Sequence, residues 1–308
     1  MPEGVLRYLM FGDAVAVQCG LALMAGGLAS MIWLRRCASP WARSVAQASR
    51  RSCFIGAGIT GVASVAALWF QAAAMGDGTL GSAGSMVGMM VGETHYGHAW
   101  SAGFVALTAA AIGMAALRRF FVPVGAFGLA AFMLTRSVVS HAGVDGDFTL
   151  KVLVDWVHLV LVCLWVGMVL LGAFIALRRA PNTQVDAADS AAWVSSLSEA
   201  ATIALVGIVS TGALKIWWAT PSIARLVASS YGGVLLVKLL LVGAAIALGG
   251  VNRFFVMPPL LGRLQGVVQT APDPQRRFLQ VLRMEALVLL LVLVVAAILS
   301  GTPNPGEG

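Results

Sequence analysis

LVDWVHLVLVCLWVGM, residues 153–168, is apolar enough to lie inside a lipid bilayer, yet it contains Asp155, His158 and Cys163 among its Leu, Val and Trp residues. On a helix, Asp155 and His158 are three positions apart and share a face, and Trp165 lies two turns beyond His158 on the same face. An ionisable residue in a membrane span is costly and therefore indicates function. The competing interpretation is a structural histidine near the membrane surface, hydrogen-bonded to Asp155.

The composition of the whole chain is that of a membrane protein. Hydrophobic residues make up 59% of the 308 residues and charged residues 11%, whereas soluble domains have about 25% charged residues. The apolar runs are continuous and about twenty residues long, as spanning helices require. A membrane barrel would instead show alternating segments of about ten residues. The sequence therefore predicts an all-α, polytopic membrane protein.

Eight spans can be drawn, at about 9–34, 53–75, 97–117, 120–141, 152–177, 196–219, 232–251 and 280–300. Arginines gather in the loops after the odd-numbered spans, and Asp77, Glu93, Asp145 and Asp147 lie in the other loops. The arginines are Arg35, Arg36, Arg43, Arg50, Arg51, Arg118, Arg119, Arg178, Arg179, Arg253, Arg263, Arg276, Arg277 and Arg283. By the positive-inside rule, the arginine-rich face is cytoplasmic and both termini are periplasmic in a bacterium. This distribution accounts for the net charge of +7 without a nucleic-acid partner.

An internal similarity predicts two four-helix halves, residues 1–150 and 151–308. Thr94-His95-Tyr96-Gly97-His98 opens the third span, and Ser229-Ser230-Tyr231-Gly232-Gly233 opens the seventh. GVASVAALWF in the second span likewise resembles GIVSTGALKIWW in the sixth. Since four spans return a chain to its starting side, we expect the two halves to be related as parallel repeats.

The histidines and several methionines are the candidate metal ligands. On the predicted topology, all four histidines lie toward the outer side: His95, His98, His141 and His158. The outer segment 76–98 is rich in Gly and Ser, which predicts a mobile loop, and it carries Met86, Met89 and Met90. Thioether sulfur suits Cu(I), and imidazole suits Cu(I) or Cu(II). Alternatively, the methionines fill an apolar contact.

The second half resembles the CopD (copper resistance D) family of bacterial inner-membrane proteins. Four stretches over about residues 150–305 carry the resemblance. They are His158 with Leu164-Trp165-Val166-Gly167, Tyr231-Gly232-Gly233-Val234-Leu235-Leu236-Val237-Lys238, Asn252-Arg253, and Arg283-Met284-Glu285 before a tail with Thr302-Pro303-Asn304-Pro305. The first half is similar more loosely, through Tyr96-Gly97 and Ser140-His141. The resemblance implies an eight-helix inner-membrane protein of copper handling that works with a separate periplasmic CopC-type carrier.

Together these features predict a copper site at the outer mouth of the bundle. His158 and His141 match family histidines, whereas His95 and His98 are candidates from their own spacing. Met86, Met89 and Met90 would capture the ion, and Asp155 would orient the His158 ring, with Trp165 and Tyr96 beside the site. Tyr231, Lys238, Asn252, Arg253 and Glu285 are interpreted as structural polar groups. One copper site or two, import or binding alone, and a homodimer all remain open.

Two other classes of protein compete with copper import. Histidines on facing helices also hold haem b, which would make the protein a membrane cytochrome. A scaffold, or a copper-delivery partner of a periplasmic complex, would transport nothing. The sequence has no GxxxxGK[ST], GxSxG or HExxH motif, so we expect neither an ATP-driven pump nor an enzyme.

Overall fold

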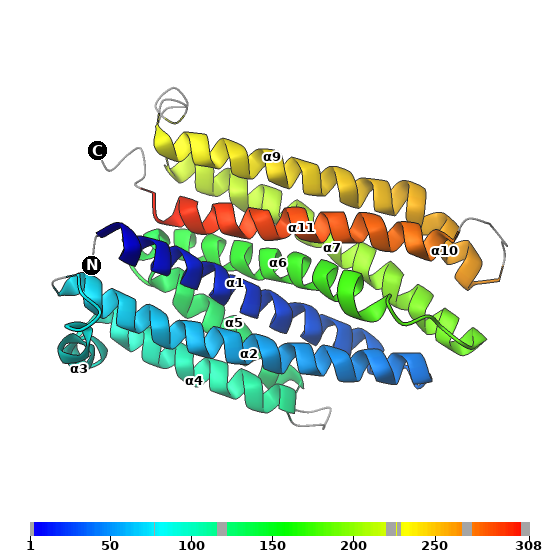
Figure 1. Cartoon of the computed structure of the whole chain (residues 1–308), viewed down its shortest axis with the longest axis horizontal. Helices are drawn as coiled ribbons and strands as arrows, with labels where there is room; N and C mark the ends of the chain where they lie inside the picture. The colour runs from blue at the N-terminus through cyan, green and yellow to red at the C-terminus, as the bar shows by residue number, and fades with distance from the viewer. Residues whose placement is uncertain are drawn as a thin grey trace.

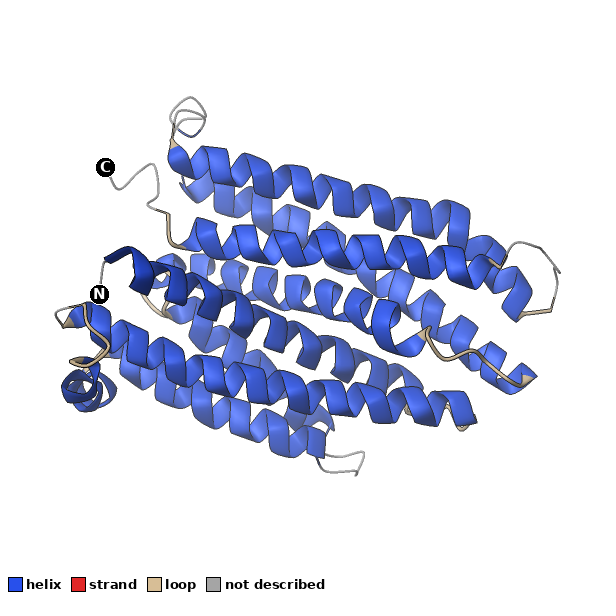
Figure 2. Cartoon of the chain, in the orientation of Figure 1, coloured by secondary structure: helices blue, strands red, loops and turns tan. Residues whose placement is uncertain are grey.

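The computed structural model describes residues 3–76, 78–115, 122–219, 226, 229–266 and 273–302, and these residues form helices and connecting turns without a strand (Figure 2). Several residues used in the sequence predictions lie outside these ranges. They are Asp77, Arg118, Arg119 and Pro303-Asn304-Pro305. The predicted all-α class is confirmed for the described part of the chain.

The long helices run side by side along the bundle (Figure 1). In chain order they are α1 (Glu3–Leu34), α2 (Pro40–Met75), α3 (Ala83–Glu93), α4 (His95–Ala115), α5 (Val122–Val138), α6 (Leu150–Leu171), α7 (Gln184–Ala219), α9 (Ser230–Val251), α10 (Met257–Leu264) and α11 (Pro274–Ser300). Short turns are the 3₁₀ helix η2 (His141–Gly143) and the π-helices η3 (Gly172–Ala176) and η4 (Asn252–Val256).

Within the described residues, seven helical segments are long and apolar enough to cross a membrane. They correspond to seven of the eight expected spans. The remaining span, expected at 120–141, corresponds to α5, which has 17 described residues and lies at the short end of the range for a spanning helix. The count of eight therefore stays a prediction.

Two helices begin much earlier than hydropathy predicts. The second span was expected at 53–75 and the sixth at 196–219, but α2 begins at Pro40 and α7 at Gln184. Ser39 caps α2, and Asp186 of α7 accepts the backbone N–H of Trp41 at 2.8 Å. The added turns are polar outside but bury Trp41 and Trp193. Packing of one face therefore extends these helices beyond their apolar stretches.

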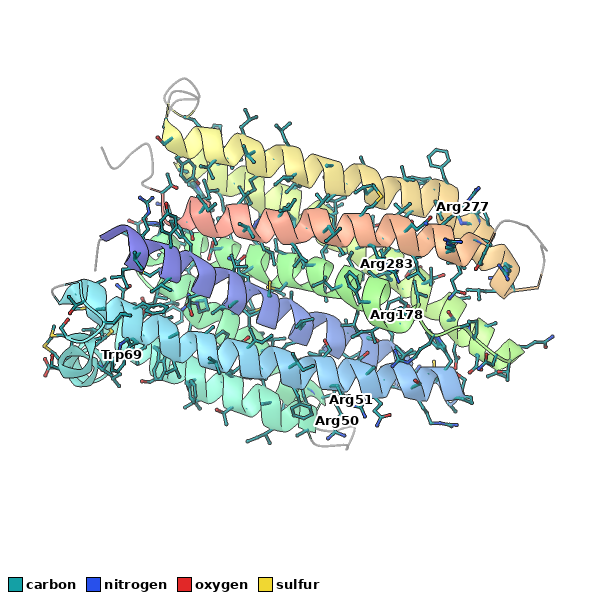
Figure 3. The ribbon with its side chains drawn as sticks, viewed as in Figure 1. Arg50, Arg51, Trp69, Arg178, Arg277 and Arg283 are labelled. Carbon is teal, nitrogen blue, oxygen red and sulfur yellow. The ribbon has the colours of Figure 1, made fainter. Side chains whose placement is uncertain are left out.

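The α6 helix lies in the middle of the bundle, where it contacts α1, α5, α7 and α11. The start of α1 and the end of α11 lie at the same end of the bundle (Figure 1), and Arg7 Nη2 is 3.5 Å from the carbonyl oxygen of Gly301. Figure 3 shows Arg50, Arg51, Arg178, Arg277 and Arg283 in the half of the bundle away from that end. We call the first end the terminal end and the second the arginine end.

Glycines let α1 and α6 approach each other closely. A Cβ added to Gly167 of α6 would collide with the carbonyl oxygen of Ala22, and one added to Gly26 of α1 would collide with the backbone of Gly167. Small residues at such crossings allow the backbone contact that drives helix association in lipid. The contact fixes α6 against the first half of the chain.

We predict that Gly167→Ala destabilises the protein, because its methyl group cannot fit at this crossing. The expected loss is about 1–3 kcal/mol, the usual cost of overpacking, measured by denaturant unfolding of the full chain in detergent. Gly243→Ala on α9 is the matched control, since a Cβ there meets no atom within 4 Å. Equal stability of the two variants would show that the α1–α6 crossing is not tightly packed.

Candidate functional site

The residues predicted to bind copper fall into two regions of the structure. His95, His98, His141 and the three methionines lie on α3, the start of α4 and the η2 turn. His158 lies within α6, two turns past the beginning of that helix. The predicted ligands therefore form an outer group and one histidine within the bundle.

The segment 76–98, expected to be a loop, contains the eleven-residue helix α3. Its inner face packs on α2: Met90 is 0% exposed and belongs to a cluster with Leu68 and Ala72, and Met86 packs against the same cluster. Met89 is 41% exposed. Burial of one face explains why a Gly-rich segment is helical here. Met90 fills an apolar contact, which was the competing interpretation of these methionines.

The outer histidines each have a separate neighbour. Nε2 of His95 lies 2.8 Å from Oδ1 of Asp147, and Nε2 of His98 lies 3.0 Å from the carbonyl oxygen of Gly92. His141 begins η2, which Ser140 caps. Across the described ranges, no three His, Cys, Asp or Glu side chains come close enough together to hold a metal ion. The four histidines, predicted from the sequence to form one copper site or two, therefore belong to no cluster of three such side chains in the described residues.

His158 is held by a residue of α7. Its Nδ1 lies 2.8 Å from Oγ1 of Thr211, and the Thr211 hydroxyl donates to the carbonyl oxygen of Gly207 at 2.6 Å. A hydroxyl has one proton, so we assign the hydrogen to Nδ1, which donates to Oγ1. This tautomer leaves Nε2 with a lone pair, the form in which imidazole binds a metal. The ring also lies against Gly212, where an added Cβ would be 3.6 Å from Cε1.

Asp155 forms an ion pair with Lys215 of α7, and the hydroxyl of Ser140 lies 3.5 Å from its second oxygen. Thr211 makes the hydrogen bond to the His158 ring, and Asp155 offsets the charge of Lys215, so an orienting role of Asp155 toward His158 stays a prediction. Lys238 of α9 lies close enough for its charge to act on both His158 and Asp155. We call Asp155, His158, Thr211 and Lys215, together with Lys238 of α9, the His158 cluster.

The charge balance of this cluster constrains what it can bind. One carboxylate faces two ammonium groups, so the cluster carries a net positive charge while His158 is neutral. A cation that reaches Nε2 of His158 is repelled by the excess charge. A copper ion would therefore bind there most favourably together with an anion, or after Lys238 has lost its proton.

A second buried group lies nearer the arginine end. Nε1 of Trp165 donates to Oε1 of Glu285 on α11 at 3.2 Å, and Asn252, at the start of η4, lies beside the same carboxyl group. Glu285 and Asn252 are each 4% exposed. Trp165, expected beside the copper site, is instead a neighbour of Glu285.

The other residues of the family-like stretches stabilise helix ends and contacts. Nη1 of Arg253 bonds Ser198 Oγ at 2.6 Å and Thr202 Oγ1 at 2.9 Å, which joins η4 to α7. Tyr231 is partly buried in the first turn of α9. In the described part of the chain, Lys238 has no ion-pair partner within 4 Å.

The two Tyr-Gly segments have the same local structure. Thr94 Oγ1 accepts the Gly97 N–H at 3.0 Å, and Ser229 Oγ accepts the Gly232 N–H at 3.0 Å. A Cβ on Gly97 would collide with the Met90 carbonyl, and one on Gly232 with the Leu226 carbonyl. This likeness explains the recurring Ser/Thr-x-Tyr-Gly pattern: a hydroxyl caps the helix, and only glycine fits behind it.

The partner residues Thr211, Lys215 and Asp147 were not predicted from the sequence. A signal for two of them was present, because Thr211 and Lys215 are four apart and share a helix face, like Asp155 and His158. Two polar pairs on apolar helices, one with a spacing of three residues and one with a spacing of four, indicate polar faces that can pack against each other. The pairing of His95 with Asp147 joins two turns and has no comparable periodic signal.

Two models of known protein families match this chain. The model described as Copper resistance protein D-like, N-terminal domain, matches residues 5–150, and the model of CopD, Copper resistance protein D, matches residues 191–299. The chain belongs to the CopD family. It is thus a membrane protein related to copper resistance, and its motif residues Tyr231, Lys238, Asn252, Arg253 and Glu285 lie in the CopD match. His158 and Trp165 lie between the two matched ranges.

Neither the search of curated proteins nor that of solved structures finds a match. The family relationship of this CopD-family protein therefore rests on the two family models and on the motif residues that they cover. Site roles come from the geometry described above.

The Asp155–Lys215 pair yields a stability prediction. Asp155→Asn should lower the free energy of unfolding by about 2 kcal/mol, the value of a hydrogen bond to a charged group, because Lys215 loses its counter-charge. Lys215→Met should also destabilise, and the double variant should lose less than the sum of the two single losses. Denaturant unfolding in detergent measures all three.

The exposed pair Lys151–Asp145, at 2.6 Å, provides the matched control. Asp145→Asn and Lys151→Met should each change stability by less than about 1 kcal/mol, as is usual for surface ion pairs. Additive losses for Asp155→Asn and Lys215→Met would show that these two side chains do not interact.

Proposed function

We propose that this CopD-family protein takes up copper at its terminal end and carries it through the bacterial inner membrane toward the arginine end. The observation that supports the proposal most directly is the fixed imidazole of His158. Thr211 holds Nδ1, and Nε2 is left as a free donor for a metal on the central helix of a copper-related membrane protein. Copper, as Cu(I) or Cu(II), is the cargo in this proposal.

Capture would begin on the outer group. Met89 exposes its thioether, and the imidazoles of His95 and His98 are accessible on the first turn of α4. Sulfur and imidazole are the ligands that copper prefers. A separate periplasmic protein of the CopC type would deliver the ion. His141, in the η2 turn that precedes α6, would be an intermediate ligand.

The proposed orientation places the arginine end in the cytoplasm and both termini in the periplasm. The clustering of arginines in the half of the bundle away from the terminal end supports it (Figure 3). Alkaline phosphatase fused to the C-terminus, which is active only outside the cytoplasm, should be active. Inactive phosphatase on a membrane-inserted fusion would reverse the orientation and with it the direction of import.

The geometry favours copper over haem. A haem b between two axial imidazoles needs histidines on facing helices. Among the described residues, His158 is the histidine within the bundle, whereas His95 and His141 lie at a helix start and in a turn.

The bilayer covers the apolar side chains that α7 and α9 expose, such as Ile203, Val206 and Leu240. The proposed protein is a carrier and has no enzymatic step.

Copper accumulation in cells that express the protein tests the proposal. His158→Ala should abolish the copper gained over cells that carry an empty vector. Thr211→Val should lower the copper affinity by about 10–100-fold, the usual effect of removing a residue that orients a metal-binding histidine. The copper gained should fall accordingly. Equal accumulation by wild type and His158→Ala would exclude His158 from the copper path.

Thr108→Val is the matched control for Thr211→Val. The Thr108 hydroxyl bonds the carbonyl of Phe104 on its own helix at 2.8 Å, as Thr211 does with Gly207, but it contacts no histidine. We expect wild-type accumulation from this control. Membrane levels of every variant are measured by immunoblot, so that lost accumulation can be separated from lost protein.

A further inference from the structure

The buried group of Trp165, Glu285 and Asn252 has no role in the proposed copper path. It joins three elements: α6 supplies Trp165, α11 supplies Glu285, and Asn252 is the first residue of the π-helix η4. Such π-helical turns often occur at functional sites. Gly249, one turn before Asn252, packs closely against the Glu285 carboxyl group. A Cβ added to this glycine would be 3.3 Å from Glu285 Oε1.

The side chain of Asn252 is buried and has no hydrogen-bond partner. Neither Oδ1 nor Nδ2 has a partner within bonding geometry among the described residues. A buried polar group without a partner costs about 1–3 kcal/mol. The amide lies beside the Glu285 carboxyl group without a hydrogen bond of regular geometry, so a small movement of either side chain would let the two groups bond each other.

No cation neutralises Glu285 among the described residues. Arg253 on η4 bonds Ser198 and Thr202, Arg283 on α11 donates to the carbonyl of Ala173 at 3.4 Å, and Arg263 on α10 pairs with Asp273. The groups that act on the Glu285 carboxyl are Trp165 and Asn252.

Several other charged or titratable groups lie on the helices packed against α11, but none of them acts on the Glu285 carboxyl group. They are Glu3, Arg7, Tyr8, Asp13 and Cys19 on α1, Lys151, Asp155, His158 and Cys163 on α6, and Tyr231 and Lys238 on α9. Arg7 bonds Gly301, and Asp155 pairs with Lys215. The carboxyl group therefore has neutral neighbours, an environment in which a lone carboxylate is unfavourable.

We propose that Glu285, Asn252 and Trp165 form a proton-binding site within the bundle. The carboxylate takes a proton from a hydronium ion, which gives a carboxylic acid and water, and it returns the proton by the reverse step. The Asn252 amide suits both states: Nδ2–H can donate to the carboxylate, and Oδ1 can accept from the acid O–H. Trp165 Nε1–H bonds Oε1 in either state and fixes the orientation of the group.

The ligand chemistry excludes copper from this site. Carboxylate and amide oxygens are hard ligands, whereas copper prefers imidazole and sulfur, and the group contains neither. A hard metal ion such as Ca²⁺ needs six or more oxygen ligands, and this group offers the oxygens of two side chains. A proton is the cation that one carboxyl group and one amide satisfy.

Infrared difference spectroscopy of the purified full chain, without copper, tests the proposal. Wild type should show the carbonyl stretch of a buried carboxylic acid that appears as pH falls, and Glu285→Gln should lose this band. Glu199→Gln, the same change at an exposed glutamate of α7, should retain it. A pH-dependent spectrum that is identical in wild type and Glu285→Gln would overturn the proposal.

Trp165→Phe provides a second readout that keeps the carboxyl group. Loss of the N–H donor to Oε1 should shift the acid band to higher wavenumber, and an unshifted band would exclude Trp165 from the site. Because copper is absent throughout, a failure here leaves the copper proposal untouched. If copper accumulation is lost in cells but the acid band is intact in the purified protein, the proton site is still supported.

Discussion

Lipid offers no hydrogen bonds, so each polar side chain of the central helix α6 has to be satisfied by a neighbouring helix. This constraint fixes the surroundings of α6. Asp155 and His158 face Lys215 and Thr211 of α7, and Trp165 faces Glu285 of α11. On the opposite side, Gly167 lets α1 approach at backbone distance. These four contacts thus hold α7, α11 and α1 against α6.

The same constraint separates the two chemical groups along α6. About 10 Å separates His158 from Trp165 along the helix axis, given a rise of about 1.5 Å per residue. The group near the terminal end offers imidazole nitrogen, which suits copper, and the group near the arginine end offers oxygens, which suit a proton. The excess positive charge at Lys215 and Lys238 makes the first group unfavourable for a cation unless one of the two ammonium groups loses its proton. A proton that leaves Lys238 would lower this barrier.

Much of the fold follows from the sequence because apolar length and Arg placement are strong local signals. Seven expected spans have counterparts in the described helices. The N-terminal extensions of α2 and α7 could not be predicted, since Trp41 and Trp193 are buried by tertiary contacts within polar stretches. Helix α3 was missed for a similar reason: Met90 packs on α2, whereas the surrounding glycines indicate a loop.

The site could be predicted only in part. Asp155, His158 and Trp165 were found because polar residues stand out in an apolar helix. Their partners are set by how helices turn toward each other, which one sequence does not specify. Asp155 therefore has Lys215 as its partner, although His158 was the nearer residue in sequence. His95 and His98 share a helical turn, yet their rings contact Asp147 and Gly92 separately.

The central claim is that copper binds through the free nitrogen of His158. The most direct test is the metal content and absorption spectrum of the purified protein after copper addition and removal of unbound metal, for wild type and His158→Ala. The account predicts that wild type retains copper without a Soret band and that His158→Ala loses copper. Equal copper in both proteins, or a Soret band with bound iron, would contradict it.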